Sequence, residues 1–109
     1  MTSRDRIAEF QEVIELMPDD PVVRFGLAGA YLDAGRAEEA AREYGEAIRL
    51  KPDYSAAHRG MGRALERAGR VAEARVAYTR GLEVAAQTGD LQTKKEIEVF
   101  LRRLGKAGG

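Results

Sequence analysis

The chain repeats itself with a period of 34 residues, and this period constrains its fold more than any other feature. A shift of 34 positions aligns residues 21–54 with 55–88, and eight positions are identical, where chance would give about two at typical residue frequencies. The identical pairs are Gly26/Gly60, Ala30/Ala64, Ala34-Gly35-Arg36/Ala68-Gly69-Arg70, Glu39-Ala40/Glu73-Ala74 and Tyr44/Tyr78. The same shift lays residues 6–20 on 40–54 with six further identities. The sequence therefore predicts half a repeat followed by two full repeats, stacked side by side.

Each repeat is predicted to be a pair of helices, which makes the fold class all-α. Asp19 or Asp20 can cap a helix that starts at Pro21, and Gly35 can end it in the left-handed conformation. Pro52 ends the second helix because it disfavours helical geometry at the residue before it. The predicted divisions are a half repeat at 4–18, repeats at 21–54 and 55–88, and a final helix at 90–104, about six helices in one domain of residues 1–104. Residues 105–109 are predicted to be a disordered tail.

Small residues at matching positions explain how the predicted helices could pack closely. Ala and Gly allow two helix backbones to approach, and Tyr44 and Tyr78 fill the volume beside them. The small positions are Ala28, Ala40 and Ala47 in the first full repeat and Gly62, Ala74 and Gly81 in the second. Because the second full repeat has Ala86 where the first has Pro52, we expect its last helix to run on. The final helix then places Ile97, Phe100, Leu101 and Leu104 on one face, as a cover for the end of the stack.

These residues resemble the pattern of the tetratricopeptide repeat, a 34-residue helix pair. The positions that match it are Leu27-Ala28, Tyr31, Ala40, Tyr44, Ala47 and Pro52, then Met61-Gly62, Leu65, Ala74, Tyr78 and Gly81, with Phe10, Val13 and Pro18 in the half repeat. The resemblance covers about residues 5–88 and implies a right-handed α-solenoid of antiparallel helix hairpins. It also implies a surface that holds a peptide or protein segment. One departure is the early aromatic position of the repeat, which holds Arg24 and His58.

Three arginines, Arg59, Arg63 and Arg67, are spaced by four residues and so share one face of a predicted helix. In the family that the chain resembles, positions equivalent to Arg59 and Arg63 often clamp a peptide carboxylate. The corresponding first-repeat positions are Phe25 and Gly29, so the complete clamp is absent. One interpretation is that the arginines grip an acidic or C-terminal peptide. The other is that they pair with Glu66, Asp33 or acids of the final helix.

An apolar strip of Val22, Phe25 and Leu32 is predicted on the first helix of the first full repeat. The half repeat before it would leave part of this surface uncovered, and uncovered apolar strips usually mark contact sites. Either a ligand segment lies there, or two copies of the chain bury the strip against each other as a homodimer. The alternative is that Ile7 and Phe10 fold over it.

Other candidate chemical groups have simpler structural explanations. His58 is the only histidine and the chain has no cysteine, so a histidine-based triad or thiolate metal site is excluded and His58 is interpreted as structural or solvent-facing. Gly60-Met61-Gly62 has no third glycine and no preceding strand, and is interpreted as helix packing. Glu38-Glu39 and Asp19-Asp20 are interpreted as acids at helix N-termini.

Charge and composition narrow the functional classes. Eighteen basic and eighteen acidic residues give a net charge of zero, so no overall field attracts nucleic acid or an anionic membrane. The sequence predicts a cytoplasmic protein-interaction module that binds a protein or peptide, with no catalytic residues, cofactor, metal, nucleic acid or membrane. The alternative is a self-associating structural protein that forms a homodimer through its N-terminal repeat face.

Overall fold

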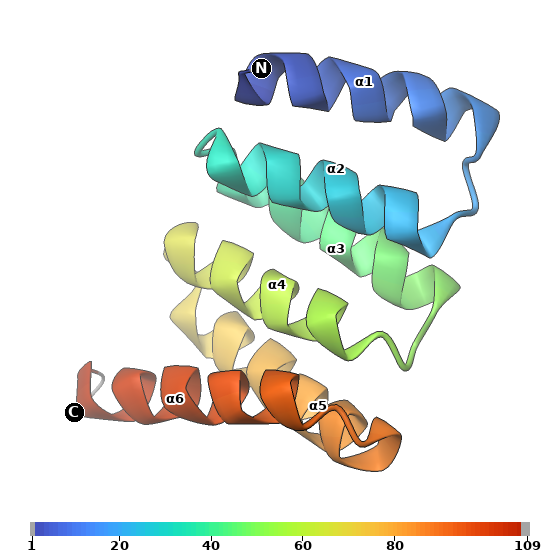
Figure 1. The fold of residues 1–109 in the computed structure, drawn as a ribbon. Coiled ribbons are helices and arrows are strands. Elements are labelled where there is room, and N and C mark those ends of the chain that lie inside the picture. Colours follow the sequence, from blue (N-terminus) through green and yellow to red (C-terminus); the bar gives the residue numbers. More distant parts are fainter. Residues whose placement is uncertain (1, 108–109) are drawn as a thin grey trace.

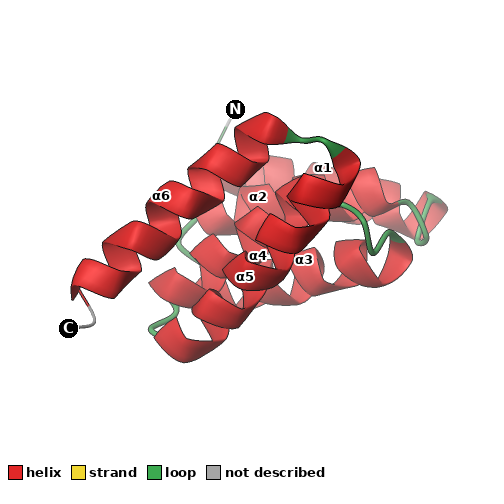
Figure 2. Cartoon of the chain, turned by 90° about the horizontal axis from the view of Figure 1, so that it is seen from below, coloured by secondary structure: helices red, strands yellow, loops and turns green. Residues whose placement is uncertain are grey.

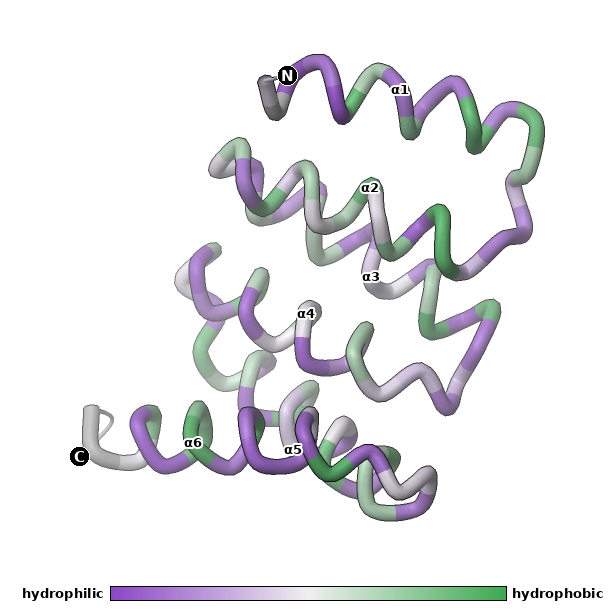
Figure 3. The backbone as a smooth tube through the Cα atoms, viewed as in Figure 1, coloured by the Kyte–Doolittle hydropathy of each residue, from purple (hydrophilic) through white to green (hydrophobic). Residues whose placement is uncertain are grey.

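Six α-helices make up the structure of the chain, which is a computed structural model that describes residues 2–107 (Figure 1). They are α1 (Ser3–Leu16), α2 (Pro21–Asp33), α3 (Ala37–Leu50), α4 (Ser55–Arg67), α5 (Val71–Thr88) and α6 (Leu91–Ala107). The all-α prediction and the predicted order of helices are confirmed. In Figure 3, apolar and polar residues alternate along the helices, as expected when one stripe of each helix faces the core.

The helices stack in the order in which they occur in the chain. Each packs against its neighbours in sequence, and further contacts join α2 to α4 and α4 to α6. Figure 1 shows the resulting row of antiparallel helices, with α1 and α6 at its two ends, and Figure 2 looks along this row from the end that carries α6. The row is elongated, with extents of 42 × 28 × 21 Å. Stacked hairpins are the arrangement that the internal period predicted.

Local sequence signals account for the helix ends. The Asp20 carboxylate accepts hydrogen bonds from the backbone N–H groups of Val22 and Val23, and Pro21 occupies the first helical position. Gly35 and Gly69 follow α2 and α4 with φ of 78° and 79°, the left-handed conformation that glycine adopts without strain. These cap predictions are confirmed.

The C-terminal half follows the predicted pattern, with one difference at its end. Helix α5 has 18 residues whereas its counterpart α3 has 14, so the helix that lacks a late proline does run on. Ile97 and Leu104 of α6 are buried against the last repeat, as predicted for a covering helix. Helix α6 continues to Ala107, through three residues of the predicted disordered tail. Leu104 anchors this last turn in the core, while residues 108–109 lie outside the described range.

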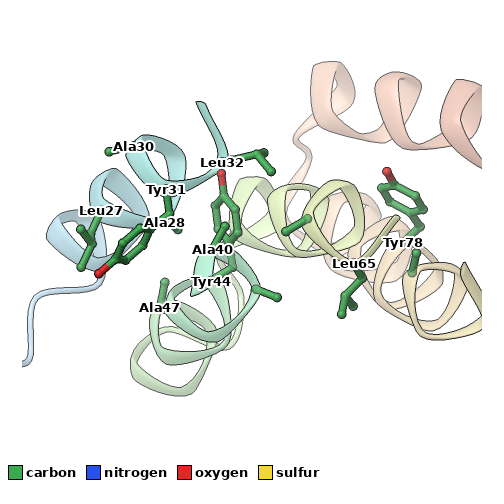
Figure 4. Close-up of a cluster of buried hydrophobic side chains, with 14 of the residues drawn as sticks. Leu27, Ala28, Ala30, Tyr31, Leu32, Ala40, Tyr44, Ala47, Leu65 and Tyr78 are labelled. Atoms are coloured by element: carbon green, nitrogen blue, oxygen red, sulfur yellow. The ribbon is translucent and has the colours of Figure 1, made fainter. Parts of the chain in front are cut away.

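The core depends on tyrosine rings that pack against glycines of the neighbouring helix. Figure 4 shows the two rings, Tyr44 and Tyr78, among the buried side chains. Tyr44 of α3 contacts Gly60 of α4 so closely that a Cβ on Gly60 would lie 2.3 Å from Tyr44 Cε1. Tyr78 of α5 meets Gly62 of α4 with the same 2.3 Å clearance. Both rings are buried. Gly60 and Gly62 therefore allow close helix packing, as the sequence predicted.

Helix α6 is fastened to α4 by the carboxylate of Asp90. Ser55 Oγ donates a hydrogen bond of 2.6 Å to Asp90 Oδ2, and the Thr93 N–H donates one of 3.1 Å to Asp90 Oδ1. The hydrogen bonds from Ser55 and Thr93 lower the pKa of Asp90 below its ordinary value. One carboxylate therefore caps α6 and ties its first turn to the start of α4.

We expect Gly60→Ala to destabilise the protein by about 1–3 kcal/mol, because the added methyl group would overlap the buried Tyr44 ring. The matched control is Gly45→Ala on α3, where the nearest atom to a new Cβ is Met61 Cε at 3.9 Å. That control should stabilise the protein by up to about 1 kcal/mol, the ordinary gain from alanine within a helix. Urea unfolding measures both. Equal effects of the two substitutions would contradict this packing account.

We expect Asp90→Ala to lower the free energy of unfolding by about 0.5–2 kcal/mol at neutral pH through loss of the cap. Because the folded state lowers the pKa of Asp90, its contribution is present above the unfolded value of about 3.9 and is lost as the pH falls through the folded pKa. The difference from the parent protein should therefore shrink below about pH 4. Asp53→Ala, at an exposed turn residue, is the control and should show no such dependence.

Candidate peptide-binding face

The three predicted arginines lie on α4, the helix that contacts both α2 and α6 (Figure 1). Arg59 and Arg63 are half-buried and Arg67 is exposed. Their side chains meet different surroundings, so the structure separates a set that the sequence treated as one.

Arg59 is held by the covering helix. Its Nη1 lies 2.8 Å from Oε1 of Glu96 on α6, and the exposed fractions of the two side chains are 24% and 40%. The sequence interpretation in which an arginine pairs with an acid of the final helix is therefore confirmed for Arg59. Glu96 therefore already compensates the charge of Arg59, which makes Arg59 a weaker attractor of a ligand carboxylate.

Arg63 and Arg67 make no ion pair or hydrogen bond with any other side chain in residues 2–107. The Arg63 guanidinium lies 5.8 Å from the centre of the Phe100 ring of α6, a cation–π contact that leaves its N–H groups free to bind an anion. Both arginines line a pocket of about 100 Å³ with Glu66, Phe100 and Arg103. The two remain available to an anionic ligand.

The acids proposed as partners of these arginines have other partners. Both carboxylate oxygens of Glu66 lie 2.7 Å from Nη2 of Arg103, and Glu66 also accepts a 3.0 Å hydrogen bond from the Tyr78 hydroxyl. Asp33 lies 2.8 Å from Nη1 of Arg6. The prediction that Glu66 or Asp33 pairs with the three arginines is therefore wrong, because nearer cations from α6 and α1 reach these acids.

The sequence reasoning treated Tyr44 as a volume filler and missed its polar end. Burial raises the pKa of Tyr44, while Arg63 and Arg59 oppose that rise, Asp33 adds to it and Arg67 opposes it more weakly. The hydroxyl is therefore protonated at neutral pH, and Gly29 of α2 lies beside it. A comparison of the two repeats could have revealed it, because Tyr44 and Tyr78 are equivalent whereas Leu32 stands at the position equivalent to Glu66.

The predicted apolar strip is not continuous in the structure. Val22 is 62% exposed, but Leu32 is only 6% exposed and belongs to the core. Phe25 is half-buried, with its ring stacked on Tyr54 at 5.1 Å and edge-on to Tyr44 at 5.7 Å. Helix α1 packs on α2 at another place, with Ile7 buried and Phe10 against Gly26, and it leaves Val22 exposed.

His58 is a structural residue in the described part of the chain. It is 5% exposed, its Nε2 lies 3.0 Å from the Pro52 carbonyl oxygen, and its Cβ packs at Gly81. It lines a pocket of about 350 Å³ among α3, α4 and α5, whose other walls are mainly apolar. Within residues 2–107 no group of acids and histidine has an arrangement that could hold a metal ion. Nor is any described helix both long and apolar enough to cross a membrane.

Comparison with known proteins identifies the repeat. A family described as tetratricopeptide repeat matches residues 31–96, and one described as YpiA-like tetratricopeptide repeats matches residues 7–51. The TPR repeat-containing protein PA0015 of Pseudomonas aeruginosa is 46% identical over 89 residues, which are 82% of this chain and 85% of that protein. The chain belongs to the tetratricopeptide repeat family. Members of this family generally act as protein-interaction modules and are generally not catalytic.

Solved structures agree with this tetratricopeptide repeat fold. Protein BPP2914 of Bordetella parapertussis is 32% identical, with a TM-score of 0.81 over 93% of this chain and 88% of that one. The translocator chaperone SycD of Yersinia enterocolitica has a TM-score of 0.90 over 97% of this chain and 74% of its own, at 17% identity. At that identity the likeness to SycD shows the fold alone.

Arg24 stands at the early position of the first full repeat where the family pattern has an aromatic residue, and in the structure it forms an ion pair. Arg24 Nη1 lies 2.9 Å from Oε1 of Glu43 on α3, and both side chains are about one-fifth exposed, at 20% and 19%. The ion pair therefore links the two helices of the first full repeat at this position.

Proposed function

We propose that this tetratricopeptide repeat domain is an adaptor that binds a peptide or protein segment across α2, α4 and α6, with Arg63 and Arg67 as its anion-binding residues. The observation that carries the proposal is that these two guanidinium groups have no acidic partner in residues 2–107. The other three arginines named on this face or beside it, Arg6, Arg59 and Arg103, are each paired with an acid. An arginine without an acidic partner favours an acidic ligand, because the ligand supplies the missing counter-charge.

The proposal revises the carboxylate-clamp hypothesis. That hypothesis paired Arg59 with Arg63, but Arg59 is engaged by Glu96, so the available pair is one turn further along α4. The remaining predicted residues keep a supporting role. Val22 is exposed, and the half-buried Phe25 offers part of its ring for apolar contact, whereas the buried Leu32 supports the face from below.

The test is a double substitution, Arg63→Gln with Arg67→Gln, compared with the parent protein in affinity capture from the native host's lysate. We expect retention of the specific partner to fall about tenfold, as the loss of two ion pairs with the ligand implies. The melting temperature should change little, because neither guanidinium makes an ion pair within residues 2–107. The matched control is Arg42→Gln with Arg80→Gln, which removes the same charge from exposed positions on α3 and α5. Equal capture by both double variants would reject the proposal.

Self-association is a second candidate, favoured by exposed apolar side chains where α1 turns into α2. Leu16 is 84% exposed, Met17 48% and Val22 62%. A cluster of exposed apolar side chains often marks a surface that is buried in an assembly. A homodimer through this corner would give a molar mass in light scattering that doubles with rising concentration. Leu16→Lys with Val22→Lys should then hold the mass at that of one chain, and a constant single-chain mass for the parent protein would exclude this candidate.

A further inference from the structure

The two full repeats bury equivalent tyrosines whose hydroxyls meet different neighbours. Tyr44 and Tyr78 are one period apart, and in Figure 4 both hydroxyls point to the same side of the stack. The Tyr78 hydroxyl donates to Glu66, whose carboxylate is also held by Arg103 on the next helix. The second repeat therefore contains a complete cluster of hydroxyl, carboxylate and guanidinium.

The first repeat contains two of these three groups and lacks the carboxylate. Leu32 stands one period before Glu66, so no acid is available at that position. The guanidinium is present, because Arg67 is the thirteenth residue of α4 as Arg103 is the thirteenth of α6. The first repeat thus has the hydroxyl of Tyr44 and the guanidinium of Arg67, with an apolar side chain where the second repeat has its acid.

The Tyr44 hydroxyl is available to an external acceptor. It makes no hydrogen bond to any side chain or carbonyl in residues 2–107, whereas the hydroxyls of Tyr31 and Tyr78 both do. Because no buried polar side-chain atom in that range lacks a partner, the Tyr44 oxygen must be reached by solvent. Gly29 leaves room beside it, since even an added Cβ there would lie 3.9 Å from the oxygen.

The charges around this hydroxyl favour an anion. The Tyr44 ring lies against Gly60 of α4, and Arg63 and Arg67 follow Gly60 at spacings of three and seven residues, on the same side of that helix. Asp33 is paired with Arg6 and Arg59 with Glu96, whereas Arg63 and Arg67 have no acidic partner in residues 2–107. Burial raises the pKa of Tyr44, so its hydroxyl is a donor at neutral pH and would accompany the two guanidinium groups as a third hydrogen-bonding group.

We propose that this space binds the side-chain carboxylate of a glutamate supplied by a partner segment, with Tyr44, Arg63 and Arg67 as donors. The assignment rests on the proposed function and names the group that the face recognises. A glutamate side chain fits because Glu66 shows the same donor types, one repeat later, closed around the carboxylate of a glutamate. The partner's glutamate completes in the first repeat the cluster that the chain completes by itself in the second.

The test uses three pentapeptides added to ¹⁵N-labelled protein. The probe is Ac-Ala-Ala-Glu-Ala-Ala-NH2, the uncharged comparison replaces Glu with Gln, and Ac-Ala-Ala-Ala-Ala-Ala-OH presents only a terminal carboxylate. We expect the glutamate peptide to shift the amide signals of Gly29, Tyr44 and Arg63 at lower concentration than either comparison. Equal shifts with the glutamine peptide, or shifts with the terminal carboxylate alone, would overturn the proposal.

Removal of one hydroxyl isolates the role of Tyr44. Tyr44→Phe should weaken binding of the glutamate peptide about tenfold, the usual effect of losing one hydrogen bond to a charged group. Tyr31→Phe is the matched control, because its hydroxyl in the same repeat accepts a hydrogen bond from Gln11 and lies outside the cluster. If both variants bind like the parent protein, the proposed role of Tyr44 is wrong.

An internal carboxylate should close the site. In Leu32→Glu the new side chain would occupy the place that Glu66 has in the second repeat, so the peptide should no longer bind, whereas Leu32→Met should bind it as the parent does. Far-ultraviolet circular dichroism establishes whether Leu32→Glu is folded. If this variant is unfolded, the peptide affinity of Tyr44→Phe tests the glutamate site instead. Continued peptide binding by a folded Leu32→Glu would contradict the assignment.

These results are separable from the test of the proposed function. If Arg63→Gln with Arg67→Gln releases a captured partner while Tyr44→Phe leaves the peptide affinity unchanged, the adaptor function stands and the glutamate site fails. If the double variant releases nothing, the adaptor proposal itself fails. If the double variant loses the partner and Tyr44→Phe loses the glutamate peptide, both the adaptor function and the glutamate site are supported.

Discussion

Close contact between tyrosine rings and glycines of the adjacent helix is the constraint on which the structure depends. Tyr44 fills the space over Gly60, and Tyr78 fills the space over Gly62. Both glycines lie on α4, so α4 is packed by a ring from the preceding hairpin and by a ring from its own partner helix α5. The packing leaves no room for a methyl group at either position, and this sets how closely α4 approaches α3 and α5.

The same packing brings two tyrosine hydroxyls to the face shared by α2, α4 and α6. The hydroxyl of a buried tyrosine must have a hydrogen-bond partner or reach solvent, because an unpaired polar atom in the interior is costly. The Tyr78 hydroxyl donates to Glu66, and Arg103 of the covering helix binds the same carboxylate, which joins that helix to the last repeat. The Tyr44 hydroxyl has no hydrogen-bond partner in residues 2–107 and is reached by solvent. The two repeats thus differ chemically at this hydroxyl, where Leu32 stands in place of the acid Glu66.

The arginines of α4 differ in whether they are paired with an acid, and this difference separates the structural residue from the candidate binding residues. Arg59 supports the fold, because its ion pair with Glu96 joins α4 to α6. The hydrogen bond between Ser55 and Asp90 joins the same two helices one turn earlier on α4. Arg63 and Arg67 make no ion pair with another residue in the described range, 2–107. Together with a family that generally binds proteins, these two arginines on one helix favour an acidic partner segment.

The sequence alone determined the helices, their caps and their stacking, because period, glycine and proline positions act locally and repeat with the chain. It also predicted the role of His58 and the function of α6 as a cover. It did not determine which arginines are free, since Glu96, Arg103 and Arg6 reach their partners across turns and helices that no spacing rule relates. Nor could it show that Leu32 is buried and that Tyr44 keeps an open hydroxyl. Those outcomes depend on distances between segments far apart in sequence, which only the tertiary packing decides.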